Sequence, residues 1–242
     1  MKKKEGAMFD HEEMECLSQE TNNEKKDGEV LEVLQKGYFI NDKVLRFAKV
    51  KVNKNNEEKK VEYTVFDNFE DSEIGEEPEG WEVSGDLKVE EVDGDKVALF
   101  NKDEDNPILR KKFDALSGKI VFEFELETEQ TDAYVQAQLR DSFGKTITRV
   151  RMHHKNGNVE MSDGDPDEGT KLADAEAGRL YKIKLVMDTE SHDMDVYLDG
   201  EKKLEGYEFT EPLDDFADIQ FFIGGAPEGS KAMIDDIKIY QL

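Results

Sequence analysis

Apolar and polar residues alternate along most of the chain that follows residue 61. Ile120, Phe122, Phe124 and Leu126 alternate with residues that are mostly polar, and Tyr181, Ile183, Leu185 and Met187 repeat the pattern. A period of two places the apolar side chains on one face of a β-strand and the polar side chains on the other. Further runs predict strands, namely 133–139, 194–198, 221–223 and 234–239. We therefore expect a series of half-buried strands.

Turn signals lie between these runs. Asp93-Gly94 and Asp199-Gly200 are pairs typical of two-residue hairpins, and 142–145 and 155–158 also contain glycine. About a dozen short strands at this spacing, without a convincing long helix, are typical of an antiparallel sandwich or barrel. The predicted fold class is all-β.

The first 60 residues have a different pattern and predict an N-terminal arm ahead of a sandwich over 61–242. Residues 1–28 are polar and charged, and we expect them to be disordered on their own. Glu29–Gln35 is expected to make two helical turns. Tyr38–Ile40 and Val44–Val52 read as strands joined by a turn at Asn41-Asp42, and residues 53–60 read as a charged linker.

Charge divides the chain in the same way. The net charge is −26, but residues 1–65 hold 13 Lys and Arg against 14 Asp and Glu, a balance of −1. The remaining 177 residues hold 20 against 45, a balance of −25. Such a body repels nucleic acid, anionic lipid and anionic polysaccharide. Divalent cations are its natural counterions, although acidity can also serve solubility alone.

Membrane insertion and export by the standard route are not expected. No segment approaches the roughly 18 apolar residues of a membrane span. Lys2, Lys3 and Lys4 resemble the start of a signal peptide, but Glu5 and Asp10 follow where an apolar stretch should be. We expect a protein made in the cytoplasm without a signal peptide.

Few residue patterns suggest catalysis. Glu123, Glu125 and Glu127 share one face of a strand, but a retaining glycosidase needs two carboxyl groups about 5–5.5 Å apart, one with a raised pKa. A solvated outer face is the better interpretation. Arg140, Arg149 and Arg151 form a cluster that can clamp a polar ligand or balance nearby acids. The candidate aromatic platforms for a sugar are Tyr134, Phe143 and Tyr207.

Three short stretches resemble a known family of β-sandwich modules. They are Phe66–Asp71 with Gly75, Pro78, Gly80 and Trp81; Tyr197–Glu201; and Met233–Ile239. They are similar to motifs of the concanavalin-A-like, laminin-G-like jelly-roll modules. The resemblance covers about residues 62–242, and it implies an antiparallel jelly-roll sandwich whose first and last strands are neighbours.

The resemblance also implies a structural calcium ion where those strands meet. Its candidate ligands are Asp67 or Glu70 from the first strand and Asp235 or Asp236 from the last. Ca²⁺ takes six to eight oxygen ligands, and carboxylates and backbone carbonyls can supply them. The alternative is that these acids cap strand ends. Asp163, Asp165 and Asp167 form a weaker second candidate. Glu168 stands where an EF-hand loop has glycine, so an acidic hairpin tip is favoured there.

The functional hypothesis is a non-catalytic binding or structural module, displayed on a larger assembly through residues 1–60. A virion decoration or fibre protein fits the near-neutral arm and the acidic body. The expected partners are a protein assembly or further copies of this chain, and a glycan. The alternatives are a free carbohydrate-binding module or a glycoside hydrolase or polysaccharide lyase of the same fold.

Overall fold

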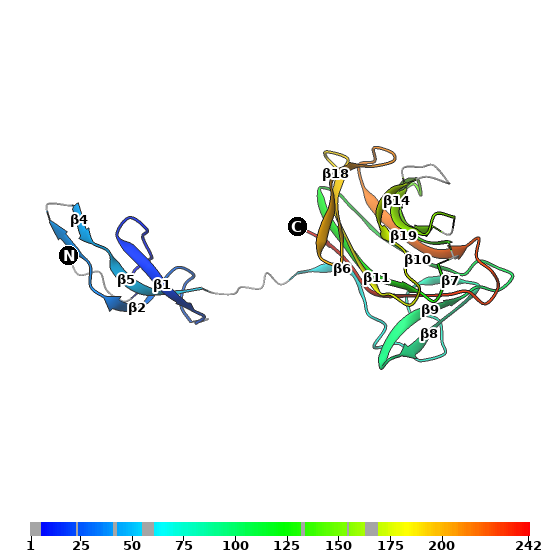
Figure 1. Cartoon of the computed structure of the whole chain (residues 1–242), viewed down its shortest axis with the longest axis horizontal. Helices are drawn as coiled ribbons and strands as arrows, with labels where there is room; N and C mark the ends of the chain where they lie inside the picture. The colour runs from blue at the N-terminus through cyan, green and yellow to red at the C-terminus, as the bar shows by residue number, and fades with distance from the viewer. Residues whose placement is uncertain are drawn as a thin grey trace. The chain divides into compact units, whose positions relative to one another are not determined.

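The computed structural model describes residues 6–22, 24–40, 43–54, 61–131, 134–153, 155–162 and 169–242. The chain divides into two compact units, Met1–Val61 and Glu62–Leu242, here called unit one and unit two. Every regular element of the described residues is a β-strand (Figure 1). Among those residues, none forms a helix with the length and apolarity needed to cross a membrane.

The described residues of unit one form five short strands. They are β1 Met14–Glu20, β2 Val30–Gln35, β3 Tyr38–Ile40, β4 Lys43–Arg46 and β5 Ala48–Asn53. The central strand β5 pairs in parallel with β1 and antiparallel with β2, and β3 and β4 form a separate hairpin.

A small core holds the three-stranded sheet together. Met14, Val30, Ala48, Val50 and Val52 are buried on one face. The other face is charged. Lys51 lies 2.9 Å from Glu20 and 3.6 Å from Glu32. This sheet is therefore amphipathic, with one face in the core and the other open to solvent.

One prediction for unit one is wrong, and another is not tested. Residues 1–28 were expected to be disordered on their own, and in the full chain they supply β1 and its core residue Met14, which pack against β5. The behaviour of the isolated segment stays a prediction. The helix expected over Glu29–Gln35 is the strand β2, because Val30 and Val33 pack against β5 through an irregular register that hides the period of two. Local propensity yields here to tertiary pairing.

The strand predicted over Val44–Val52 is interrupted. The structure divides it into β4 and β5 at Phe47, whereas the prediction of β3 over Tyr38–Ile40 is confirmed. The turn predicted at Asn41-Asp42 lies outside the described residues. Residues 55–60 of the expected linker also lie outside them.

Unit two contains fifteen of the strands. They are β6 Tyr63–Asp67, β7 Glu82–Ser84, β8 Asp86–Val92, β9 Asp95–Asn101, β10 Ile108–Leu116, β11 Lys119–Thr128, β12 Tyr134–Arg140, β13 Thr146–His153, β14 Asn158–Ser162, β15 Thr170–Asp174, β16 Tyr181–Asp188, β17 Asp193–Leu198, β18 Glu201–Glu208, β19 Phe216–Gly224 and β20 Lys231–Gln241.

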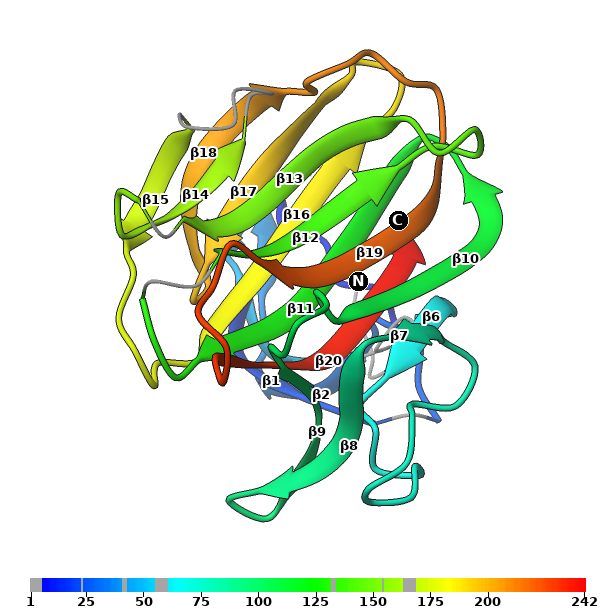
Figure 2. The ribbon, with the colours of Figure 1, turned by 90° about the vertical axis from the view of Figure 1, so that its right-hand side faces the viewer.

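These strands form two antiparallel sheets that lie face to face (Figure 2). One has seven strands in the order β15-β14-β13-β12-β19-β10-β7. The other has eight strands, in the order β18-β17-β16-β11-β20-β9-β8, with β6 paired to β20. The predicted all-β antiparallel sandwich is confirmed, and so is the predicted adjacency of its first and last strands.

The core lies between the sheets and is rich in aromatic residues. Phe122 and Phe124 of β11 stack with ring centroids 4.9 Å apart, and Phe124 contacts Phe221 of β19 at 5.3 Å. These rings interlock the two layers because inward-facing residues of both sheets share one apolar space. The predicted turns are also confirmed: Asp93-Gly94 and Asp199-Gly200 connect β8 to β9 and β17 to β18 with positive φ at all four residues.

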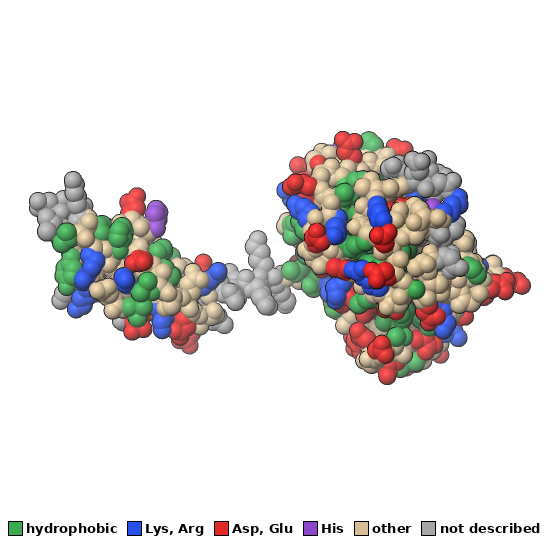
Figure 3. All heavy atoms as spheres, viewed as in Figure 1, with side chains coloured by type: hydrophobic (Ala, Val, Ile, Leu, Met, Phe, Trp, Pro, Cys, Tyr) green, Lys and Arg blue, Asp and Glu red, His purple; other side chains and the backbone are tan. Residues whose placement is uncertain are grey.

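Charge is unevenly distributed over unit two. Acidic side chains gather around the hairpin of β8 and β9, at the bottom of the sandwich in the view of Figure 3. Elsewhere on this face, lysine and arginine side chains are interspersed with acids (Figure 3). The net negative charge of the chain is therefore compatible with local surfaces that are neutral or positively charged.

Candidate functional site

The outer face of the seven-stranded sheet is polar across its central strands. Residues of β12, β13, β14 and β19 that alternate with core residues point away from the core. We call this surface the polar face. It comprises Tyr134, Gln136, Gln138 and Arg140 of β12, Arg149, Arg151 and His153 of β13, Glu160 and Ser162 of β14, and Asp218, Gln220 and Phe222 of β19.

Strand register places these side chains in rows. Gln138 lies opposite Arg149 on one side and Gln220 on the other. In the next row, Gln136 lies between Arg151 and Phe222. Side chains directly opposite on neighbouring strands have Cβ atoms about 4.5–5.5 Å apart, so each row presents adjacent polar groups.

One end of the polar face is organised by Asp218. Arg110 of the neighbouring strand β10 donates from Nε to Asp218 Oδ1 at 3.0 Å and also forms an ion pair through Nη2. The hydrogen bonds to Asp218 raise the pKa of Arg110. Arg140 is more distant, with Nη1 at 3.8 Å from Asp218 Oδ2, and it donates to Gln220 Oε1 at 2.6 Å.

The other end holds a buried ion pair. Arg151 Nε donates to Glu160 Oε1 at 2.7 Å, and the side chains are 1% and 0% exposed. Asn156 Nδ2 donates to the second oxygen, Oε2, at 2.9 Å. A buried pair of this kind survives only with further hydrogen bonds, which these groups have. Arg151 therefore fixes this end of the surface in one geometry.

Aromatic rings lie beside this ion pair. Arg151 Nη1 donates to the Tyr134 hydroxyl at 3.3 Å, and the guanidinium lies 5.8 Å from the Tyr134 ring centroid. The rings of Tyr134 and Phe222 are 6.0 Å apart. Both side chains are half-buried, so each ring keeps part of its surface open. Aromatic groups next to fixed polar groups are typical of small-ligand sites.

Some polar atoms of this surface lack partners. Among the described residues, Gln136 Oε1 and Arg140 Nε are buried without a hydrogen bond. Buried polar atoms are nearly always hydrogen-bonded in folded proteins, and each exception requires an explanation. Both atoms lie on a surface lined by guanidinium and amide groups.

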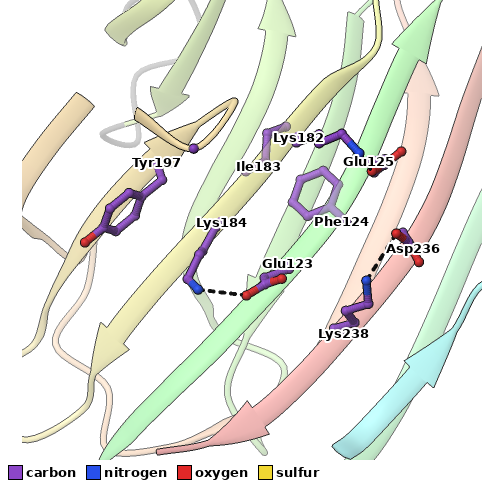
Figure 4. Close-up of a pocket in the computed structure, with 10 residues that line it drawn as sticks. Glu123, Phe124, Glu125, Lys182, Ile183, Lys184, Tyr197, Asp236 and Lys238 are labelled. Atoms are coloured by element: carbon purple, nitrogen blue, oxygen red, sulfur yellow. Dashed lines mark hydrogen bonds and ion pairs between the residues drawn. The ribbon is translucent and has the colours of Figure 1, made fainter. Parts of the chain in front are cut away.

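A hollow lies on the outer face of the eight-stranded sheet. It has a volume of about 490 Å³ and is lined by charged residues of β11, β16 and β20 and by Tyr197 (Figure 4). Glu123 pairs with Lys184 at 2.9 Å, Asp236 pairs with Lys238 at 3.1 Å, and Glu125 pairs with Lys182. The hydrogen bond with Glu125 raises the pKa of Lys182. Each of these carboxylates is already paired with a lysine, which lies on the adjacent strand β16 for Glu123 and Glu125 and on the same strand, β20, for Asp236.

Asp67 and Glu70, the predicted calcium ligands near the first strand, already have hydrogen-bond donors. Asp67 accepts the backbone N–H of Phe69 at 3.0 Å with Oδ1 and the indole N–H of Trp81 at 2.6 Å with Oδ2. Glu70 Oε1 accepts the backbone N–H of Lys96 at 2.9 Å. The strand-capping interpretation accounts for both residues without a metal.

The last strand supplies a more unusual pair. Asp235 is 7% exposed and its Oδ1 has no hydrogen-bond partner among the described residues. Burial raises the pKa of Asp235 to about 7, and the charges of Asp236, Asp95 and Glu125 add to the rise. Asp236 occupies a bulge in β20 with a φ of 52°, and it pairs with Lys238.

The predicted calcium ligands are thus only partly assembled. Within the described part of the chain, no group of three or more His, Cys, Asp or Glu side chains is arranged to hold a metal ion. Asp235 Oδ1 has no hydrogen-bond partner among the described residues, whereas each oxygen of Asp67 already accepts one hydrogen bond. The second candidate set, Asp163, Asp165 and Asp167, lies outside the described residues. Calcium binding stays a prediction.

Sequence reasoning found part of the polar face. It selected Arg140, Arg149, Arg151 and Tyr134, all of which lie on this surface. Phe143 and Tyr207 do not. Phe143 is 93% exposed after β12, and Tyr207 packs against the core from β18. The analysis missed further residues of the polar face, whose alternation with core residues was the available signal: Gln136, Gln138, Glu160, Asp218, Gln220 and Phe222.

Two family models match separate parts of the chain. Residues 89–230 match a family described as "Sialidase-like, CBM domain", where CBM denotes a carbohydrate-binding module. Residues 1–54 match the GrpE family. Together they cover most of both units.

The curated relatives include GrpE proteins, the family matched by residues 1–54. Protein GrpE of Acholeplasma laidlawii (strain PG-8A) is 46% identical over 48 residues, which are 20% of this chain and 25% of that protein. Protein GrpE of Lysinibacillus sphaericus is 47% identical over 51 residues, 21% of this chain and 26% of that protein. The chain therefore spans about a quarter of the length of these relatives.

Solved structures resemble the chain in fold. A sialidase aligns with a TM-score of 0.62 and 19% identity, covering 89% of this chain and 21% of the sialidase chain. The Emp47p carbohydrate recognition domain has a TM-score of 0.51 and 10% identity, with 77% and 99% covered. Crh5 transglycosylase has a TM-score of 0.54 and 14% identity, with 75% and 85% covered. At such identities the likeness shows a shared β-sandwich fold.

Proposed function

This chain belongs to the sialidase-like CBM family, and on that premise we propose that unit two binds carbohydrate through the polar face without cleaving it. The observation that carries the proposal is the pair of buried unpartnered atoms, Gln136 Oε1 and Arg140 Nε, beside the half-open rings of Tyr134 and Phe222. Sugar hydroxyls both donate and accept hydrogen bonds, and sugar rings present apolar C–H groups to aromatic faces. The polar face offers both kinds of partner.

The acids of the polar face support binding rather than hydrolysis. Asp218 is held by Arg110, and Glu160 is 0% exposed and held by Arg151. Glycoside hydrolysis by two carboxyl groups requires one to donate a proton to the substrate and the other to attack or activate water. Carboxylates that are paired with arginine, one of which is buried, are poorly placed to donate a proton to a substrate or to attack it.

The test is a glycan screen followed by matched aromatic substitutions. Phe222→Ala removes an aromatic platform from the polar face, and we expect it to weaken binding of any glycan hit at least about tenfold, equivalent to about 1.4 kcal/mol. Phe143→Ala makes the same change at an exposed position outside the polar face and should leave affinity unchanged. Weakening by Tyr197→Ala with no effect of Phe222→Ala would place the site in the hollow of Figure 4 instead.

For unit one, we propose a protein-contacting role that attaches the chain to an assembly. Its small sheet leaves large apolar side chains open to solvent, among them Leu17, Leu34, Tyr38 and Leu45 at 51%, 47%, 53% and 67% exposure. Exposed apolar groups concentrated on a small unit are typical of interaction surfaces. The near-neutral charge of residues 1–65 lets them approach another surface without strong repulsion. Display on a virion stays a prediction.

Size measurement tests whether that partner is another copy of this chain. We expect the full chain to sediment as an oligomer and residues 62–242 as a monomer at the same concentration. Leu45→Ser should reduce the association without unfolding unit one, since Leu45 is outside its core. A monomeric full chain would exclude self-association and leave a different protein as the partner.

A further inference from the structure

Within the acidic unit two, the hollow of Figure 4 is electrically balanced. Its volume is about 490 Å³, within the range of small-molecule sites. The charged residues that line it are three acids and three lysines, a balance of zero: Glu123, Glu125, Asp236, Lys182, Lys184 and Lys238. Residues 66–242 together hold 20 Lys and Arg against 45 Asp and Glu, a balance of −25. A charged ligand of either sign would meet like charges in this hollow, whereas an uncharged polar ligand would meet no repulsion.

Strand register extends the hollow into a row across five strands. The residues that lie opposite one another on β6, β20, β11, β16 and β17 are Phe66, Lys238, Glu123, Lys184 and Tyr197. Each points away from the core, because it alternates with buried residues of its own strand. Neighbouring strands are about 4.8 Å apart, so the aromatic residues at the two ends of the row are separated by roughly 19 Å.

Aromatic rings at both ends of this row keep part of their surface open. At the β6 end, Tyr63 and Phe66 are 42% and 50% exposed, and their ring centroids are 5.3 Å apart. Tyr240 of β20 meets Tyr63 edge to face at 5.6 Å, and we call these three residues the aromatic cluster. At the other end, Tyr197 is half-buried, and Lys202 Nζ lies 5.6 Å from its ring centroid. Exposed apolar groups that are clustered in this way are typical of binding surfaces.

The polar groups between the rings keep hydrogen-bonding capacity. Glu123 Oε1 accepts a hydrogen bond from the Tyr240 hydroxyl at 3.0 Å, and Lys184 Nζ lies 2.9 Å from the same oxygen (Figure 4). Glu125 pairs with Lys182, also through Oε1. No described residue donates a hydrogen bond to Oε2 of either glutamate. A carboxylate has about four acceptor positions and an ammonium group donates three hydrogen bonds, so hydroxyl groups can bind here without breaking the ion pairs.

We propose that the hollow and the aromatic cluster form a second glycan site, which binds an uncharged oligosaccharide. The inference goes beyond the proposed function, because it assigns a ligand to the opposite face of the sandwich and uses no residue of the polar face. Sugar hydroxyls donate and accept hydrogen bonds, which matches the alternation of lysine and glutamate along the row. The C–H faces of sugar rings match the aromatic side chains at its ends. A chain of several sugars is needed to span the roughly 19 Å between them.

The two sites differ in strength and in direction. At the polar face, buried Gln136 Oε1 and Arg140 Nε have no partner among the described residues, whereas the acids and lysines of the hollow are already paired. A ligand at the hollow mainly replaces water, and such an exchange of hydrogen bonds has a small net value. We therefore expect the second site to be the weaker one. Because the two sheets lie face to face, the sites open in opposite directions, and one molecule can hold two polysaccharide chains (Figure 2).

The test is calorimetric titration of the full chain with uncharged hexasaccharides of glucose, xylose, mannose and N-acetylglucosamine. At least one of them should bind at two sites per chain. Tyr197→Ala and Phe66→Ala should each reduce affinity at the weaker site at least tenfold and leave the tighter site unchanged. Phe143→Ala, the matched change at an exposed phenylalanine outside both sites, should have no effect. The disaccharide of the same sugar should bind the weaker site at least tenfold less tightly, because it cannot reach both ends of the row.

The outcomes separate this inference from the proposed function. A single site per chain, lost in Phe222→Ala and unchanged in Tyr197→Ala and Phe66→Ala, overturns the second site and leaves the proposed function intact. Binding that is lost in Tyr197→Ala and unchanged in Phe222→Ala supports the second site and overturns the proposed function. Absence of binding by every hexasaccharide overturns the second site, and tighter binding there of a galacturonate hexasaccharide overturns the assignment to an uncharged ligand. The fluorescence of Trp81, the sole tryptophan, confirms that each variant is folded.

Discussion

The buried carboxyl group of Asp235 makes a sharp prediction about stability and pH. Its side chain is 7% exposed, Oδ1 has no hydrogen-bond partner among the described residues, and Asp236, Asp95 and Glu125 add negative charge around it. Burial is the main cause of the rise in its pKa from 3.8 to about 7. The ionised form is therefore disfavoured in the folded protein.

The sign of the effect follows from proton binding. Because the pKa of Asp235 is higher in the folded state than in the unfolded state, the folded protein binds the proton more tightly between pH 3.8 and about 7. The free energy of unfolding must then fall as pH rises through this window. A shift of about three units corresponds to about 4 kcal/mol once the pH is well above 7.

Asp235→Asn tests this reasoning because it keeps the shape and removes the ionisation. In chelator, the variant should exceed the unchanged chain in free energy of unfolding by about 3–4 kcal/mol at pH 8, and by less than about 1 kcal/mol at pH 4.5. Denaturant titration followed by Trp81 fluorescence measures unit two selectively, since Trp81 packs against its core.

An exposed acid supplies the control. Asp71→Asn, at an exposed side chain, should leave the stability profile parallel to that of the unchanged chain. Profiles of Asp235→Asn that stay parallel from pH 4.5 to 8, or a variant less stable at pH 8, would refute the reasoning.

Three further predictions concern the metal, the buried ion pair and the division of the chain. Millimolar Ca²⁺ should raise the melting temperature, and at a hundredfold excess over Kd the stabilisation should be about 2.7 kcal/mol. Asp236→Ala should abolish this rise. Identical melting curves in calcium and in chelator would contradict the prediction. Glu160→Gln should lower the free energy of unfolding by about 3–5 kcal/mol because the buried ion pair between Glu160 and Arg151 is broken. The matched change at an exposed position, Glu91→Gln, should alter it by less than about 0.5 kcal/mol. Residues 62–242 should fold alone with a cooperative melt, and an insoluble product would mean that unit one completes the core.

Several features of the molecule could be predicted from short stretches of sequence. The alternation in Ile120–Leu126 predicted a strand with one apolar face, and β11 has that form. Asp93-Gly94 and Asp199-Gly200 predicted hairpin turns because few residues accept positive φ, and both turns are present. These predictions succeeded because the determining forces act between residues that are close in sequence.

Unit one shows where local patterns failed. Val30 and Val33 have a spacing that also suits a helix, and the residues that precede them are mostly polar. The structure instead pairs Val33 with Val50 and buries Met14 against the same strand, so the order of this segment depends on β5. A strand that gains its stability from a partner cannot be assigned from its own residues.

The candidate site divides in the same manner. The sequence by itself determined that Arg140, Arg149 and Arg151 share a sheet and point to one face, because alternation fixes the face of every strand residue. Only the tertiary structure decided which acids of the described residues pair with these arginines. Asp218, which is taken by Arg110, lies 108 residues from it in the chain, and that pairing depends on the order and register of β10 and β19. Strand order is set by how both sheets bury their apolar faces together, a property of the whole sandwich that no short segment contains.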